Sequence, residues 1–260
     1  MNKYFVFFIL SAKDALKGKE ALFGLIFFLG TIMIFYNQLW AAVSMERLLV
    51  IKKTNINYIW YSLFSELIIL STPTLHRTLE EDINAGAVAY FVNRPVSFFT
   101  MRFAEGIGTL SVNFLFLLVF GMLIAYLLVH EILISSLHLT IIICLCFLSA
   151  ILNLLIITAV GFCALWIHTT KPIHLLVQNG MFVLGGVILP LTIYPDWLII
   201  ISKHTPFYYM FFMVAQLSYN FNCQDVLLIL QMDLFWGSII ISLVAFTYHK
   251  LYKKINIYGG

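Results

Sequence analysis

Residues 106–130 of this chain read GIGTLSVNFLFLLVFGMLIAYLLVH and contain no Asp, Glu, Lys or Arg. A helix that crosses the hydrocarbon core of a bilayer needs roughly 20 mostly apolar residues, so this stretch is long enough to cross one. The composition of the whole chain agrees, because 62% of its 260 residues are hydrophobic, 10% are charged and the mean hydropathy is +0.98. A soluble core of this size cannot hide so much apolar surface. We therefore predict an integral membrane protein.

The same wide spacing between charges predicts five further spans. Two of them carry one acid each, Glu66 in the second span and Asp233 in the last. The strands of an outer-membrane barrel would be only about 10 residues long and would alternate in polarity, which these stretches do not. The predicted fold class is therefore all-α, with residues 1–260 forming a single transmembrane domain. The six predicted spans are 21–45, 54–76, 106–130, 137–168, 172–194 and 226–249.

The distribution of Lys and Arg predicts the orientation of these spans, because positive residues resist translocation and collect on the cytoplasmic side. With the N-terminus inside and six spans, eleven of the 15 Lys and Arg residues are cytoplasmic. The four that fall outside are Arg47, Lys52, Lys53 and Lys203. We expect a multi-pass protein of the bacterial cytoplasmic (inner) membrane, with both termini cytoplasmic.

The first 19 residues are predicted to form an interfacial helix. Tyr4, Phe5 and Phe8 recur at helical spacing, while Lys13 and Lys17 lie away from them. No small-residue cleavage site follows the short apolar run, so we expect this segment to stay attached. The alternative is a frayed amphipathic leader without a partner.

A polar island separates the second and third predicted spans, and its centre is predicted to be an amphipathic helix over 78–93. Thr78 and Glu81 have the spacing of a capping box, so the helix is expected to begin at Thr78. Glu80, Glu81 and Asp82 put three negative charges in the first turn, where the helix dipole favours them. A solvated surface loop is the competing interpretation. The further residues of the island on which the functional prediction depends are Ile83, Gly86, Arg94 and Pro95.

A second informative stretch precedes the last predicted span. Its prolines break the helix near the predicted outer surface, and the apolar run that follows is too short to cross a bilayer. We predict an outer re-entrant segment over 195–218. The residues that carry this prediction are Pro190, Pro195, Trp197, Pro206 and Phe207.

Taken in this order and at these spacings, the N-terminal segment, the island from Glu80 to Pro95 and the Pro190 to Phe207 set resemble the permeases of the ATP-binding-cassette (ABC) type-2 transporter family. The resemblance covers nearly the whole chain. It implies an exporter-like, six-span permease subunit, in which the helix over 78–93 is the coupling helix that docks onto a separate ATPase subunit. The analogy favours export, and the Phe, Leu and Ile side chains of the spans suit a lipid-like or amphipathic cargo.

The resemblance further implies the partners. We expect two copies of an ABC ATPase subunit and a second permease subunit, in a homodimer or a related heterodimer, surrounded by membrane lipid. No phosphate-binding loop of the form Gly-x-x-x-x-Gly-Lys-Ser/Thr occurs in the sequence. ATP and Mg would therefore be bound by the partner ATPase, and we expect the chain itself to be no enzyme, to hold no cofactor or metal and to bind no nucleic acid.

Glu66 is the ionisable residue predicted to lie deepest in the bilayer, where a charge is costly unless it is paired or hydrated. It is a candidate for pathway or subunit contact, and helix packing is an equally good explanation. The four cysteines and seven histidines have no catalytic or metal-ligand spacing and are expected to be structural. An ion-coupled secondary transporter or a membrane-embedded enzyme remains an alternative function, although acids and catalytic groups do not cluster as either would need.

Overall fold

The computed structural model of the protein describes residues 3–42, 55–87, 96–131 and 134–258. Within these ranges the chain forms helices and turns and contains no strand, which confirms the predicted all-α class. The α-helices are α1 (Lys3–Lys17), α2 (Lys19–Ala42), α4 (Asn55–Ser71), α5 (Leu75–Asn84), α7 (Phe98–Val129), α8 (Ser136–Phe162), α9 (Lys171–Leu184), α10 (Asp196–Lys203), α11 (Val214–Gln216) and α12 (Cys223–Tyr258). Short 3₁₀ turns span Cys163–Leu165 and Leu191–Ile193, and a π-helical segment spans Tyr208–Met213.

Four helical stretches in the described part of the chain are long and apolar enough to cross a membrane. They correspond to the first, third, fourth and sixth predicted spans and indicate a membrane protein. The stretches are Lys19–Trp40, Phe98–Val129, Ser136–Leu165 and Cys223–Thr247.

The structure differs from the sequence prediction at the other two spans. The predicted span 54–76 ends early because α4 stops at Ser71, since Pro73 disfavours helical geometry in the residue before it. The predicted span 172–194 is interrupted because α9 ends at Leu184 and Gly186 adopts a left-handed φ of 64°. At 1.5 Å per residue the 14 residues of α9 cover about 21 Å, which is less than the roughly 30 Å of a hydrocarbon core. Six complete spans therefore stay a prediction.

The predicted outer segment 195–218 is a bent pair of helices. The segment Asp196–Lys203 and the segment Tyr208–Gln216 meet at 102°, a geometry that a broken span and a re-entrant loop share. Pro195 is the N-cap residue of α10. Since Pro206 lies in the sequence between the two segments, the helix is broken where the sequence predicts a break.

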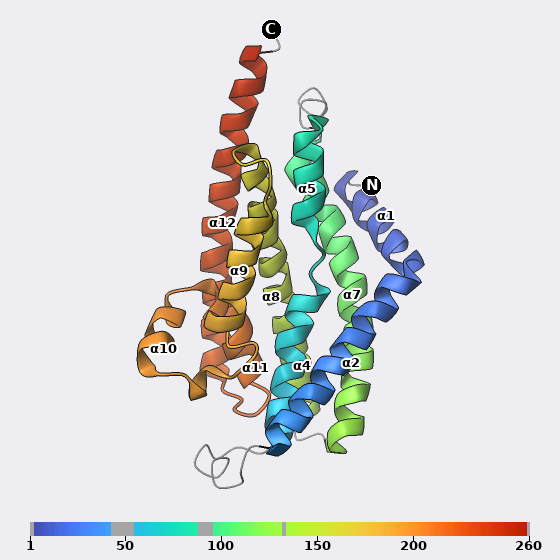
Figure 1. Ribbon diagram of the computed structural model, residues 1–260, viewed down its shortest axis with the longest axis vertical. Helices are drawn as coiled ribbons and strands as arrows, with labels where there is room; N and C mark the ends of the chain where they lie inside the picture. The colour runs from blue at the N-terminus through green and yellow to red at the C-terminus, as the bar shows by residue number, and fades with distance from the viewer. Residues whose placement is uncertain (1–2, 43–54, 88–95, 132–133, 259–260) are drawn as a thin grey trace.

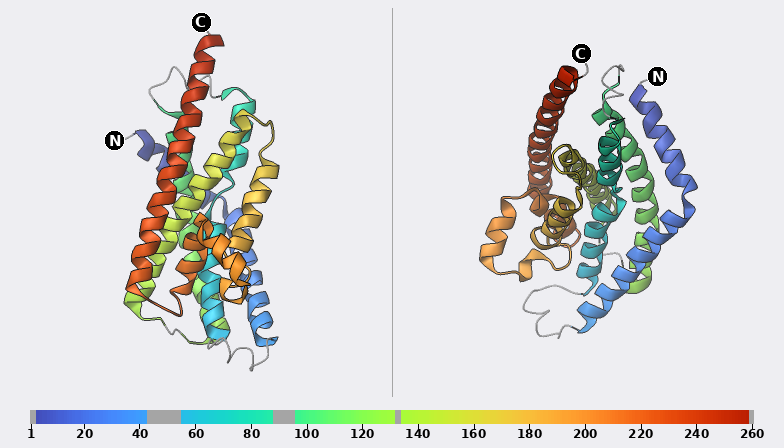
Figure 2. Two further views of the ribbon diagram at one scale, coloured as in Figure 1. Left: turned by 90° about the vertical axis from the view of Figure 1, so that its left-hand side faces the viewer. Right: turned by 45° about the horizontal axis from the view of Figure 1, so that its top comes forward.

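The helices form an elongated bundle in which α4 and α8 lie at the centre (Figure 1). Aromatic residues of α4 make up much of the core, and Trp60, Tyr61 and Phe64 are each at most 1% exposed. The helices α2 and α12 lie on opposite sides of the bundle (Figure 2). Both present large exposed apolar side chains, such as Phe23 and Leu234.

The first helix packs against α7 in an inclined position rather than standing apart from the bundle (Figure 1). Ser11 on α1 and Thr109 on α7 share a hydrogen bond of 2.8 Å between their hydroxyl oxygens. Gly108 allows this close approach, because a Cβ there would collide with the carbonyl oxygen of Phe8. The first turn of α1, all of α5 and the last turns of α12 lie at the same end of the bundle (Figures 1 and 2).

Candidate functional site

The candidate site is centred on α5, which begins one turn earlier than the sequence predicts. Thr74 follows Pro73 and is the N-cap residue, and its carbonyl accepts the amide of Arg77 at 3.1 Å. Thr78 lies inside the helix, so the predicted start and the predicted capping box at Thr78 are wrong. The proline break already supplies a helix start, and no second one is needed a turn later.

The helix also ends earlier than predicted, at Asn84 rather than Asn93. Gly86 terminates this turn with a φ of 73°, and its amide donates to the carbonyl of Ile83 at 3.0 Å. The last predicted residues of the coupling segment, including Arg94 and Pro95, lie outside the described residues.

One face of α5 is buried against α8. Leu75, His76 and Leu79 are buried, and Leu79 is 0% exposed. Gly161 on α8 makes this contact possible, because a Cβ there would lie 2.6 Å from Leu79 Cδ1. The burial of this face attaches the first half of α5 to the bundle.

The opposite face of α5 is exposed, and we call it the exposed α5 face. Four of its exposed residues fall on one side of the helix at spacings of one, four and eight residues, as a helical period requires. They are Arg77, Thr78, Glu81 and Ala85. The helix α5 lies at the end of the bundle that also holds the first turn of α1 (Figure 1).

Two of the three predicted acidic residues are engaged within the bundle. The Glu80 carboxylate accepts from the backbone N–H of Thr170 at 2.7 Å and from its hydroxyl at 2.5 Å. These bonds lower the pKa of Glu80, because they stabilise the charged carboxylate at the start of α9. Asp82 forms an ion pair of 2.6 Å with Arg102 of α7. Only Glu81 of the acidic turn belongs to the exposed α5 face.

Further contacts complete the attachment of α5. Arg102 also pairs with Glu105 at 2.7 Å, so one guanidinium holds two carboxylates at the junction of α5 and α7. The side-chain amide of Asn84 donates to the carbonyl of His168 at 2.9 Å, in the connection between α8 and α9. Ile83 packs against the hydrophobic core. The helix α5 is therefore in direct contact with α7, with α8 and with the residues that lead into α9.

The structure also contains a cluster that the sequence did not reveal. His76 of α5 and His174 of α9 stack with their ring centroids 3.8 Å apart. Burial is the main cause that lowers the pKa of His76 to about 4, with smaller contributions from His174 and Arg77, while Glu80 acts in the opposite direction. The two histidines are far apart in the sequence and share no motif, so only the packing of α5 against α9 brings them together.

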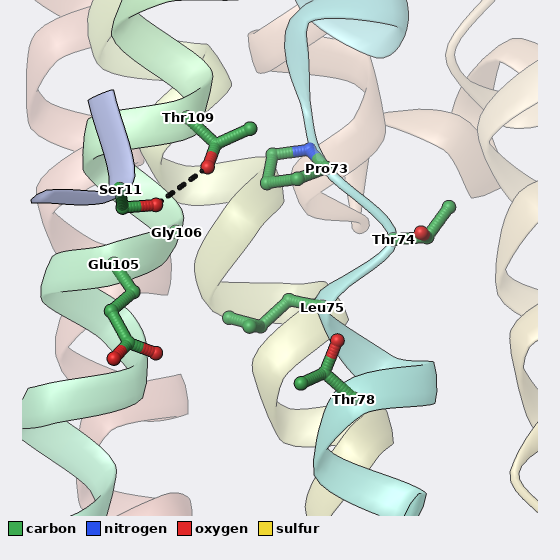
Figure 3. A pocket seen from close by; sticks show the side chains of 8 residues that line it. All are labelled: Ser11, Pro73, Thr74, Leu75, Thr78, Glu105, Gly106 and Thr109. Atoms are coloured by element: carbon green, nitrogen blue, oxygen red, sulfur yellow. Dashed lines mark hydrogen bonds between the residues drawn. The ribbon is translucent and has the colours of Figure 1, made fainter. Parts of the chain in front are cut away.

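A cavity of about 230 Å³ lies beside the break between α4 and α5, on the side of α1 and α7 (Figure 3). Ser11 and Thr109 line one wall and are joined by their hydrogen bond, while Pro73, Thr74 and Thr78 line the other. The residues that line this cavity come from α1, from the break itself, from α5 and from α7. The break therefore lies beside open space rather than in a packed core.

The predicted pathway residue Glu66 lies apart from this cluster. It is 4% exposed and sits among the buried residues of α4, beside Ser65. Asp233 of α12 accepts a hydrogen bond of 2.8 Å from the Ser149 hydroxyl of α8. Neither carboxyl lines the cavities described beside α5, so these cavities do not join them to the predicted coupling residues.

The predicted outer residues form a separate region near the bend. Trp197 is 62% exposed, and Phe207 packs near Gly180 of α9, where a Cβ would lie 3.2 Å from its ring. The helix is interrupted after α9, and Pro190 is the N-cap residue of the 3₁₀ turn that follows the interruption. Inside the interruption, the Tyr61 hydroxyl donates a hydrogen bond of 2.6 Å to the carbonyl of Gly186. The backbone group freed by the break is thus satisfied inside the bundle, as a membrane environment requires.

No protein-family model matches the chain, and no curated protein matches its sequence at a significant level. The resemblance to ABC permeases therefore depends on the residues quoted for it.

Proposed function

We propose that this chain is the permease subunit of an ABC exporter and that α5 is its coupling helix. The observation that carries the proposal is the way α5 is built. One of its faces is buried on α8, its acidic residues Asp82 and Glu80 bond to α7 and to the start of α9, and the exposed α5 face is left for a partner. A loop that merely connected two spans would have no need of so many attachments.

The mechanism follows from these attachments. When the partner ATPase subunits close on MgATP, they displace α5 as a rigid body, since Leu79 and Gly161 leave no slack against α8. Arg102 transmits this displacement to α7 and Glu80 transmits it to α9. The ATPase supplies the free energy of ATP hydrolysis, and this chain converts it into a change of the bundle.

The apolar surface supports the proposal of the other partners. The exposed apolar side chains of α2 and α12, among them Phe23, Phe27 and Leu234, are suited to lipid and to a second permease subunit. We place the chain in the bacterial cytoplasmic membrane with both termini and α5 on the cytoplasmic side. The cargo is a lipid-like or amphipathic molecule that moves outward.

The test is co-purification of an ATPase with the tagged full-length chain. We expect vanadate-sensitive ATPase activity in the purified complex, and we expect it to be lost in the double variant Arg77→Glu, Glu81→Lys, which changes only the exposed α5 face. The matched control is Asp196→Lys, a charge reversal at an exposed residue of α10. Absence of any ATPase from the wild-type complex, or full activity in the double variant, contradicts the proposal.

A further inference from the structure

A second cavity, of about 220 Å³, lies beside the break between α4 and α5, on the side of α8 and α9. Its walls come from α2, α4, α5, α8 and α9 and from the break itself. One water molecule needs roughly 10–15 Å³ of such volume, so this cavity has room for a small organic ligand. Non-helical backbone at membrane depth is tolerated where it lines a cavity, as the break does here.

One part of the wall is apolar, and no part of it is charged. No Asp, Glu, Lys or Arg is among the residues that line this cavity in the described part of the chain. A charged head placed here would lose its hydration without gaining a counter-ion on the wall, which is costly. The wall therefore favours an uncharged ligand. The apolar side chains that line it are Leu25, Ile69, Leu70, Ile157 and Met181.

The charges of the adjoining cavity do not change this preference. That cavity, of about 620 Å³, shares the two stacked histidines with the cavity of about 220 Å³. The charged residues that line it are two cations and two carboxylates, Arg77, Lys171, Glu80 and Glu81. Because their formal charges cancel, they select neither an anion nor a cation next door.

Asn153 of α8 supplies an acceptor without a partner on the wall of the cavity of about 220 Å³. The Thr72 hydroxyl donates its one proton to the carbonyl of Ile68 at 2.9 Å, so it can only accept from the Asn153 amide nitrogen at 3.0 Å. This arrangement fixes the side-chain amide and leaves Oδ1 without a partner in the described part of the chain. Asn153 is 2% exposed, so Oδ1 does not reach bulk solvent. A buried acceptor without a partner costs free energy that a bound donor recovers.

The stacked histidines add polar atoms that can take either role. Nδ1 of His76 and Nδ1 of His174 also lack partners among the residues that the structure describes. The low pKa of His76, caused mainly by burial, keeps its ring neutral at pH 7, and a neutral imidazole has one donor and one acceptor nitrogen. A hydroxyl both donates and accepts, so it suits this wall.

We propose that the cavity of about 220 Å³ binds an uncharged amphiphile with a hydroxyl head, which donates to Asn153 Oδ1 while its alkyl chain covers the apolar wall. One cavity holds both parts of the ligand, because Asn153 and the apolar side chains all line it. Ordered water would satisfy Asn153 but would leave the apolar wall wetted, which an alkyl chain avoids. Naming this amphiphile as the cargo deepens the proposed function and rests on it.

The test is photolabelling of the purified full-length chain in nanodiscs, without any ATPase, so that its result does not depend on the coupling partner. The probe is 3-azioctanol, an octanol that carries a photoreactive diazirine, and mass spectrometry locates the labelled residues. We expect label on the residues that line the cavity, within the peptides that carry Leu70, Ile157 or Met181. Absence of label there, as a cavity that holds only water would give, overturns the proposal.

Three unlabelled competitors test the head group at pH 8. Octan-1-ol has the hydroxyl donor, its isomer 1-methoxyheptane has an ether oxygen without a donor, and octanoate is ionised at this pH. We expect octan-1-ol to protect the cavity from labelling at a concentration at least about tenfold lower than either of the others. Equal protection by 1-methoxyheptane or by octanoate contradicts the proposal.

A variant tests the role of Asn153. Asn153→Leu keeps a side chain branched at Cγ and removes Oδ1, so the advantage of octan-1-ol over 1-methoxyheptane should disappear. The matched control is Asn179→Leu, the same change at an exposed residue of α9 that lines none of the cavities described, and it should keep the advantage. An unchanged advantage in Asn153→Leu overturns the assignment. The competitor series on the wild-type chain decides the proposal if this variant does not fold.

The two proposals fail in different ways. If octan-1-ol protects the cavity as expected but no ATPase accompanies the chain, the coupling role of α5 is wrong and the binding site stands. If an ATPase accompanies the chain and 1-methoxyheptane protects equally well, the hydroxyl site is wrong and the coupling role stands.

Discussion

The bond between Glu80 and Thr170 is expected to hold α5 to the start of α9, and its removal should loosen that junction by a measurable amount. Hydrogen bonds to a charged group contribute roughly 1.5–3 kcal/mol each, and the half-exposed position of Glu80 puts these two at the lower end. A neutral amide in place of the carboxylate keeps an acceptor worth about 0.5–1.5 kcal/mol and loses the attraction to the α9 dipole. We expect Glu80→Gln to cost about 1–2 kcal/mol locally.

The assay is hydrogen–deuterium exchange of the peptide that covers residues 166–176 in detergent or nanodiscs. A local cost near 1.4 kcal/mol corresponds to about a tenfold increase in the opening constant, seen as faster exchange at the Thr170 amide. Glu81→Gln is the control, because Glu81 lies on the exposed α5 face. In the Thr170→Val background, which lacks the hydroxyl donor but keeps the amide, the effect of Glu80→Gln should shrink. Equal exchange rates in Glu80→Gln and Glu81→Gln would refute the reasoning.

Three further perturbations test the packing and electrostatics of the same end of the bundle. Gly108→Ala should push α1 off α7 at a cost of roughly 1–3 kcal/mol and increase proteolysis of α1, whereas Gly237→Ala should not. Arg102→Met should lower the melting temperature, with a loss below the roughly 3–5 kcal/mol of a fully buried pair because 22% of Arg102 and 19% of Asp82 is exposed. On acidification from pH 7 to 4.5 the protein should lose thermal stability, because the pKa of His76 is near 6.5 in the unfolded chain and about 4 in the folded chain. The variant His76→Gln should reduce this loss.

The transmembrane helices were predictable because their signal is compositional. A long stretch without charge, such as residues 106–130, specifies a helix that must bury or cover apolar surface, whatever its neighbours are. The matching helix α7 is longer, Phe98–Val129, because it continues into the polar end where Arg102 and Glu105 lie. Interruptions by Pro73 and by Gly185 with Gly186 shorten α4 and α9, since the local backbone preference there overrides the apolar pattern.

The candidate site was predictable only in part. The amphipathic pattern placed a helix at the right part of the island, but Thr78 and Glu81 suggested a capping box that Pro73 and Thr74 make unnecessary. Asp82 and Glu80 face the bundle because Arg102 and Thr170 lie beside them in the folded chain. The sequence pattern does not indicate these positions. The stacked pair of His76 and His174 is likewise a product of tertiary packing.

The exposed α5 face must lie on the cytoplasmic side if an ATPase is to reach it. The measurement is labelling of a single cysteine, Glu81→Cys, by a membrane-impermeant maleimide in right-side-out and inside-out vesicles, with Trp197→Cys as the outer reference. The native cysteines at 144, 146, 163 and 223 are first replaced by serine, because Cys144 and Cys223 are exposed. We predict that Glu81→Cys is labelled only in inside-out vesicles and Trp197→Cys only in right-side-out vesicles. Labelling of Glu81→Cys in right-side-out vesicles would contradict the coupling role of α5.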